Sequence, residues 1–222
     1  MNIIYIHGLD SDANSTKGLL LKRYCQQYHP DINVLRPDLN KSPAQVFEQL
    51  IYLMESLNHN ENKEVKDIDG ISNFRDAVLV GSSLGGYFST LVSNHTGCPA
   101  LLLNPSTQPH MTLQRFSNDD LLDSKDNPLT DRVLHQTTGG WSITQADLQW
   151  FADHQLSKVN YPEKIAVFIK EGDELLNPEL SKAFYQQQGS TVILQAGGDH
   201  RFSDFGEQLP MVINMLQDLV RV

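Results

Sequence analysis

The feature that most constrains the fold is the alternation of short apolar runs with longer amphipathic segments. Amphipathic patterns predict helices over residues 43–57, from about residue 177 to 189, and over 207–220. Strands that alternate with helices form a parallel sheet with right-handed crossovers. We therefore predict an α/β fold with a mostly parallel sheet and helices on both faces. The six runs with the length and composition of buried strands are residues 2–6, 32–35, 77–80, 100–103, 165–169 and 191–194.

Two segments do not follow this alternation. Residues 58–73 are polar and charged, and we interpret them as a solvated loop. Residues 106–162, between the fourth and fifth predicted strands, are far longer than one crossover requires. We interpret them as a cap-like insertion above the sheet. The chain of 222 residues is long enough for one large core, so we expect a single domain over residues 1–222.

Composition argues against several kinds of partner and site. A net charge of −10 and a pI near 5.1 oppose binding to nucleic acid or to anionic membranes. No apolar run approaches the ~20 residues that span a bilayer, and the N-terminal run lacks a basic flank. Cys25 and Cys98 form no CxxC pair, and the eight histidines form no HxH or HExxH pattern. We expect a cytoplasmic protein with no metal site.

One serine lies where a strand meets a helix. Residues 77–91 read AVLVGSSLGGYFSTL, in which an apolar run passes through a glycine-rich turn into a helix-compatible segment. Residues 81–85, GSSLG, match the G-x-S-x-G pattern of a nucleophile elbow. In that turn the central serine is strained and exposed, and glycines avoid collisions with the neighbouring strand and helix. We predict that Ser83 is a nucleophile; the alternative is a glycine turn with idle serines.

A serine nucleophile needs a base, and the base needs an acid to orient it. In elbow hydrolases these partners follow the serine in the order acid, then histidine. Asp173, in KEGDELL, and His200, in GGDHRF, each follow a late strand, at the sheet edge where the serine emerges. We predict that His200 is the base and Asp173 the acid. Glu171, Glu174 and Asp199 are nearby alternatives, although Asp199 adjoins the histidine and adjacent side chains diverge.

Two backbone N–H groups are candidates for an oxyanion hole. Leu84 follows the nucleophile, and Leu9 lies in the loop HGLDSDANS after the first strand. His7 begins this loop, but it precedes the serine in the chain, so we interpret it as a structural hydrogen-bonding residue. The sequence contains neither GxxxxGK[ST] nor GxGxxG, which argues against a phosphate-binding loop.

In combination these motifs resemble the YqiA/YcfP-like family of small bacterial α/β-hydrolase esterases. The resemblance covers nearly the whole chain. It implies the α/β-hydrolase fold, esterase or thioesterase activity on acyl esters, no cofactor, and a triad of Ser83, Asp173 and His200. Leu9 stands where such proteins often have phenylalanine, which alters the pocket wall. The stretches that carry the likeness are IYIHGLDSDANSTKG, RPDLNKSP, GSSLGGYFSTLV, LLLNPSTQP, EGDELLN and GGDHRFSDF.

We therefore predict a serine hydrolase that cleaves small-molecule carboxylic esters or thioesters through an acyl-enzyme. A C–C bond hydrolase or lyase with the same triad is an alternative, as is a non-catalytic binding protein on the same scaffold. Within the insertion, we expect Trp141 and Trp150 to form an acyl-binding wall together with Phe116, Leu121 and Phe151. The alternative is that these side chains anchor the insertion to the sheet.

Overall fold

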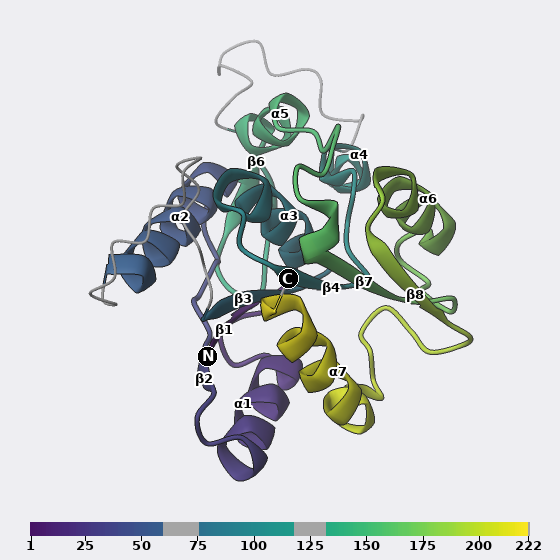
Figure 1. Ribbon diagram of the computed structural model, residues 1–222. Coiled ribbons are helices and arrows are strands. Elements are labelled where there is room, and N and C mark those ends of the chain that lie inside the picture. Colours follow the sequence, from purple (N-terminus) through teal and green to yellow (C-terminus); the bar gives the residue numbers. More distant parts are fainter. Residues whose placement is uncertain (60–75, 118–131, 222) are drawn as a thin grey trace.

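The computed structural model describes residues 1–59, 76–117 and 132–221 (Figure 1). In this part of the chain, six strands form one parallel sheet in the order β2-β1-β3-β4-β7-β8. The prediction of a six-stranded parallel sheet, with an insertion between its fourth and fifth strands in chain order, is confirmed. In the order of the sheet, the strands are β2 (Asn33–Leu35), β1 (Asn2–Ile6), β3 (Ala77–Ser82), β4 (Ala100–Leu103), β7 (Ile165–Lys170) and β8 (Thr191–Gln195).

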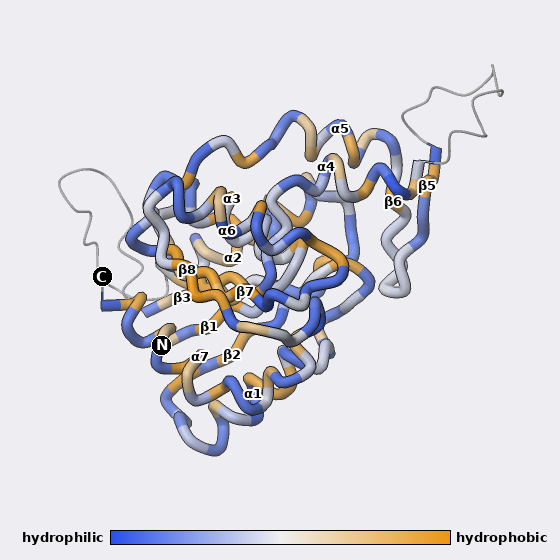
Figure 2. The backbone as a smooth tube through the Cα atoms, turned by 90° about the vertical axis from the view of Figure 1, so that its right-hand side faces the viewer, coloured by the Kyte–Doolittle hydropathy of each residue, from blue (hydrophilic) through white to orange (hydrophobic). Residues whose placement is uncertain are grey.

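Helices cover both faces of the sheet because its strands are apolar on both sides. Along β1, Ile4 and Ile6 belong to one buried cluster, whereas Ile3 and Tyr5 belong to the other, as the two-residue period of a strand requires. Figure 2 shows hydrophobic stretches gathered at β3, β7 and β8. In Figure 1, α1 (Thr16–Tyr28) and α7 (Phe205–Val220) lie on one face, and α2 (Pro43–His59), α3 (Leu84–Thr96) and α6 (Pro178–Gln188) lie on the other.

Several element boundaries differ from the sequence prediction. Strand β3 extends to Ser82, two residues beyond the predicted end, and α7 begins at Phe205. The sequence analysis missed α1, whose buried residues are only Gly18, Leu21 and Cys25, so its apolar stripe is narrow. Of the predicted loop over residues 58–73, residues 58 and 59 form the end of α2. The loop residues from position 60 onward lie outside the described residues.

The described parts of residues 106–162, which are residues 106–117 and 132–162, form short elements on the side of the sheet that carries α2 and α3 (Figure 1). A capping box between Thr144 and Asp147 starts α5. The hydroxyl of Tyr87 in α3 donates to the His154 carbonyl at 2.6 Å, which joins the end of α5 to the core. The elements are α4 (Pro109–Thr112), η1 (Leu113–Phe116), the antiparallel strands β5 (Val133–Gln136) and β6 (Ser142–Thr144), α5 (Gln145–Asp153) and η4 (Pro162–Lys164).

The strand order places a crevice beside β1. The chain passes from β1 to β2 at the sheet edge, then returns to the other side of β1 with β3. The connections after β1 and β3 therefore diverge, and such switch points bind ligands at the carboxyl ends of the strands. Within the described residues, no helix has both the length and the apolar character needed to cross a bilayer.

Candidate active site

Ser83 occupies a strained turn between β3 and α3. Its φ of 55° and ψ of −118° are unusual for a residue with a side chain. The turn is tight: a Cβ on Gly85 would overlap the carbonyl oxygen of Ile6, and one on Gly81 would overlap the Gly85 carbonyl. Within residues 81–90, Ser83 is the one residue that is not buried. The turn thus exposes the Ser83 hydroxyl at the N-terminus of a helix, where backbone N–H groups favour negative charge.

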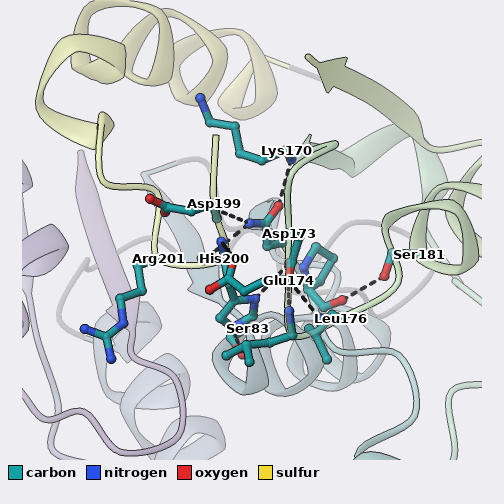
Figure 3. A network of polar contacts seen from close by, with 12 residues as sticks. Ser83, Lys170, Asp173, Glu174, Leu176, Ser181, Asp199, His200 and Arg201 are labelled. Atoms are coloured by element: carbon teal, nitrogen blue, oxygen red, sulfur yellow. Dashed lines mark hydrogen bonds and ion pairs between the residues drawn. The ribbon is translucent and has the colours of Figure 1, made fainter. Parts of the chain in front are cut away.

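A chain of hydrogen bonds joins Ser83 to His200 and Asp173 (Figure 3). His200 Nδ1 lies 2.8 Å from Asp173 Oδ2, and its Nε2 lies 2.9 Å from Ser83 Oγ. A carboxylate can only accept, so Nδ1 carries the proton, and neutral Nε2 accepts from the serine hydroxyl. The side chain of Asp173 is 2% exposed, and its Oδ1 accepts from the N–H groups of Leu175 and Leu176 at 2.9 and 2.8 Å. The carboxylate is therefore fixed on both oxygens.

Two of the alternative acids make other contacts. The Asp199 carboxylate accepts from the N–H of Ser203 at 3.0 Å, and Figure 3 shows its side chain directed away from the imidazole. Glu174 accepts from the backbone N–H of His200 at 3.0 Å, so it holds the loop and not the ring. The arrangement matches the prediction that Asp173 contacts the ring and that Asp199 points away from it.

The two predicted oxyanion donors lie beside the serine turn. Leu84 is the first residue of α3, where an N–H has no acceptor within the helix. Leu9 lies in the loop after β1, and a Cβ on Gly8 in that loop would come within 3.1 Å of Ser83 Cβ. Neither N–H has a hydrogen-bond acceptor among the described residues. Both amides are therefore free to bind a substrate oxygen.

His7 fixes the peptide group that carries one of these amides. The N–H of Leu39 donates to His7 Nε2 at 3.0 Å, so Nδ1 carries the proton and donates to the Gly8 carbonyl at 2.9 Å. In a trans peptide the C=O and N–H point in opposite directions. A hydrogen bond on the Gly8 oxygen therefore directs the Leu9 N–H away from the imidazole. The structural role predicted for His7 thus includes orienting this peptide.

Asn104 was missed by the sequence analysis. It follows β4, is 2% exposed and has a φ of 42°. Its amide donates to the carbonyls of Asp199 and His200 at 3.1 and 3.3 Å, and its oxygen accepts from Lys170 N–H at 2.8 Å. Asn104 thereby joins the end of β7 to the histidine loop. The available signal was an asparagine between a strand and Pro105, because asparagine tolerates positive φ.

A cavity of about 670 Å³ opens beside Ser83 and His200. Its walls come from the loop after β1, the start of α1, the loops after β4, β7 and β8, and the α4–η1 segment. Its lining includes six leucines, which are Leu9, Leu20, Leu84, Leu113, Leu175 and Leu176.

Trp141 and Trp150, which the sequence analysis assigned to an acyl-binding wall, are not among the residues that line this cavity. The Trp141 indole N–H donates to Asp147 at 3.2 Å, and Trp150 stacks on His154 at 3.9 Å between ring centroids. Trp150 also packs near Phe88 of α3. These contacts attach the insertion to the core, so the cavity gives no support to an acyl-binding role for either tryptophan.

The other predicted wall residues also lack that support. Phe116 stacks on His135 at 4.1 Å, and Phe151 is fully buried against Tyr87. Leu121 lies outside the described residues. Among the described residues, no group of three or more histidine, cysteine, aspartate or glutamate side chains is arranged to hold a metal ion.

Comparisons with solved structures identify the fold. Est1E from Butyrivibrio proteoclasticus has a TM-score of 0.65 at 14% identity, over 98% of this chain and 85% of that one. Mouse alpha/beta hydrolase domain-containing protein 10 has a TM-score of 0.64 at 15% identity, over 98% and 90%. The esterase domain of a Rhodothermus marinus protein has a TM-score of 0.63 at 17% identity, over 99% and 86%. These similarities show an α/β-hydrolase fold.

The family comparison extends over nearly the whole chain. The model of an uncharacterised protein family, UPF0227, matches residues 2–217. This match confirms the resemblance to YqiA/YcfP-like proteins that the motifs indicated. The chain therefore belongs to the UPF0227 family and has the α/β-hydrolase fold.

Proposed function

We propose that this protein is a serine hydrolase that cleaves carboxylic esters or thioesters. The observation that carries the proposal is the hydrogen-bonded chain Ser83–His200–Asp173, which begins at a strained, partly exposed serine beside a cavity. A nucleophile, an oriented base and a buried acid are the components that acyl transfer needs. The fold supports the proposal because esterases share it.

In the proposed reaction, Ser83 Oγ attacks the acyl carbon while His200 Nε2 takes the hydroxyl proton. The N–H groups of Leu9 and Leu84 stabilise the resulting oxyanion. His200 then gives its proton to the leaving alcohol or thiol, and an acyl-enzyme remains on Ser83. A water molecule, deprotonated by His200, attacks that acyl group and releases the acid. Asp173 stabilises the imidazolium in both halves of the reaction without taking its proton.

The proposal includes the organisation of the chain around the cavity. We assign residues 1–222 to one hydrolase domain and residues 106–162 to a cap-like insertion within it. The insertion contributes Ser106, Thr112, Leu113 and Arg115 to the cavity lining, and these residues would contact the substrate. Est1E, which shares the fold, has been solved with ferulic acid bound, so this fold can accommodate a small organic ligand.

A fluorophosphonate probe tests the nucleophile because it labels activated serines covalently. The wild-type protein should be labelled, and Ser83→Ala should lose the label together with turnover of 4-nitrophenyl butyrate. Ser82→Ala is the matched control, because Ser82 is 3% exposed and precedes the turn within β3. Loss of labelling in Ser82→Ala but not in Ser83→Ala would refute the assignment. An unlabelled, inactive wild-type protein would refute the proposed function.

A further inference from the structure

The cavity beside Ser83 has two chemically different ends. Figure 3 shows Arg201 and Leu176 on opposite sides of Ser83 and His200, with Arg201 near the chain that follows β1. Leu175 and Leu176 make the wall on one side apolar. The wall on the Arg201 side carries the polar residues Ser11, Asn14, Ser15, Thr16, Lys17 and Ser203, and Leu20, Phe202 and Phe205 also line the cavity. A substrate held at Ser83 therefore meets an apolar surface in one direction and a surface with charged and polar groups in the other.

The polar end contains two adjacent cations. Lys17 Nζ donates to the backbone carbonyl of Arg201 at 2.6 Å, which places the ammonium group at the histidine loop. Among the described residues, neither Lys17 nor Arg201 has a carboxylate within 4.0 Å. The nearby carboxylate of Asp199 accepts from Ser203, which leaves the ammonium with two unused donors. Unpaired cations at a cavity wall attract anions. These two cations stand out because the protein as a whole has a net charge of −10.

A buried hydroxyl gives a second, independent indication of a ligand. Ser106 is 4% exposed, lines the cavity, and its Oγ has no hydrogen-bond partner among the described residues. Its own N–H donates to the Ser83 carbonyl at 3.0 Å, so this serine adjoins the proposed nucleophile. A buried hydroxyl without a partner is unfavourable unless a ligand supplies one. The cavity therefore contains a polar contact that this structure leaves unused.

Asp199 interacts electrostatically with Lys17. Among the described residues, however, no acidic side chain forms an ion pair with Lys17 or Arg201. Asp10 is the acidic residue in the cavity lining, and its carboxylate accepts from the N–H of Thr138 at 3.1 Å and lies 3.9 Å from His135. Its charge is thus directed toward the insertion. Lys17, Arg201 and the unused Ser106 hydroxyl therefore keep hydrogen-bonding capacity for a ligand.

We propose that the substrate is an ester or thioester carrying a carboxylate or phosphate group, which Lys17 and Arg201 bind while its apolar part contacts the leucines. Ser106 bonds a polar substrate atom next to the reacting carbonyl. This inference rests on the proposed hydrolase function and specifies its substrate class. A hydrogen bond to a charged group contributes roughly 10- to 100-fold in affinity. We therefore expect a preference of at least about tenfold for anionic esters over neutral esters of the same length.

Matched substrate pairs measure this preference. Mono-4-nitrophenyl adipate and 4-nitrophenyl hexanoate differ by a carboxylate on the acyl side. 4-Acetoxyphenyl phosphate and 4-methoxyphenyl acetate differ by a phosphate on the alcohol side. The ratio of kcat/KM within each pair tells which anion is recognised. Lys17→Met and Arg201→Gln should each lower that ratio about tenfold. Arg23→Gln, which removes an exposed charge from α1 outside the cavity lining, should leave it unchanged.

A binding measurement keeps the inference testable if no ester is cleaved. Calorimetric titration of Ser83→Ala with monoethyl adipate, diethyl adipate and inorganic phosphate compares anionic with neutral ligands. Tighter binding of an anion, weakened about tenfold by adding Arg201→Gln, supports the inference. Ratios within about twofold of unity in both ester pairs, together with no anion binding, overturn it. Hydrolysis of neutral esters in that case leaves the proposed function intact, whereas loss of fluorophosphonate labelling refutes the function separately.

Discussion

Asp173→Asn is the sharpest test of the proposed mechanism, because the structure determines how the new amide would be placed. Asp173 Oδ1 accepts from the N–H groups of Leu175 and Leu176, and Oδ2 accepts from His200 Nδ1. An asparagine can satisfy the two backbone donors only by placing its oxygen at the Oδ1 position. Its NH₂ group then faces the imidazole and donates to Nδ1. The ring proton moves to Nε2, and His200 can no longer accept the Ser83 proton.

The expected loss follows from this change of tautomer. The equivalent substitution in a serine-protease triad lowers kcat by about 10⁴, and we expect roughly 10³–10⁴ here. That corresponds to about 4–5.5 kcal/mol of transition-state stabilisation at 1.36 kcal/mol per tenfold. The assay is kcat for 4-nitrophenyl butyrate at saturating substrate, with circular dichroism and thermal melting to confirm folding. Because the asparagine keeps the shape of the buried side chain, the fold should persist.

Asp199→Asn is the matched control for this experiment. Its side chain accepts from Ser203 and not from the imidazole, so kcat should fall by less than about tenfold. A folded Asp173→Asn enzyme that keeps more than about a tenth of its kcat would refute the tautomer argument. A severe loss in Asp199→Asn beside a mild loss in Asp173→Asn would instead transfer the orienting role to Asp199.

Two further predictions concern His7 and Lys17. His7→Phe removes the donor that orients the Leu9 peptide, so kcat should fall by roughly 10- to 100-fold with little change in KM. A lowered melting temperature with unchanged kcat would indicate that His7 has a purely structural role. The pKa of Lys17 is lowered to about 8, chiefly by burial. Repulsion by Arg201 also lowers this pKa, whereas attraction to Asp199 raises it. The preference for anionic esters should therefore be complete below pH 8 and decline as pH rises through 8; a pH profile of the kcat/KM ratio measures this, and Lys17→Arg should flatten it.

The strands could be predicted because each strand carries its own signal. A run such as residues 77–80 is apolar at every position, as burial on both faces requires, and that pattern needs no knowledge of distant residues. Helix α1 could not be found in this way. Its Gly18 lies so close to Tyr5 of β1 that an added Cβ would come within 2.9 Å of the ring. Gly18 is needed for this contact between α1 and β1, but in the sequence a glycine argues against a helix because of its low helix propensity.

The proposed active-site residues could be selected for a related reason. In a parallel sheet the carboxyl ends of strands share one edge, so chain order alone brings Ser83, Asp173 and His200 near one another. The cavity wall obeys no such rule. Trp141 and Trp150 satisfied the composition of an acyl wall, but they pack against neighbouring elements of the insertion and α3. The positions of aromatic side chains in a long insertion depend on tertiary contacts, and sequence periodicity does not encode those contacts.

The strained backbone of this protein is concentrated at that same edge of the sheet. Ser83 and Asn104 follow adjacent strands, and both are non-glycine residues with positive φ, a conformation that costs about 1–3 kcal/mol each. Hydrogen bonds hold both: Ser83 donates to Leu103 and accepts from Ser106, each at 3.0 Å, while Asn104 donates to Phe168 at 3.1 Å. The strain is thus offset during folding by contacts within the sheet. In the proposed reaction, the Ser83 hydroxyl is therefore already positioned before a substrate binds, and no part of the binding energy is needed to bring it there.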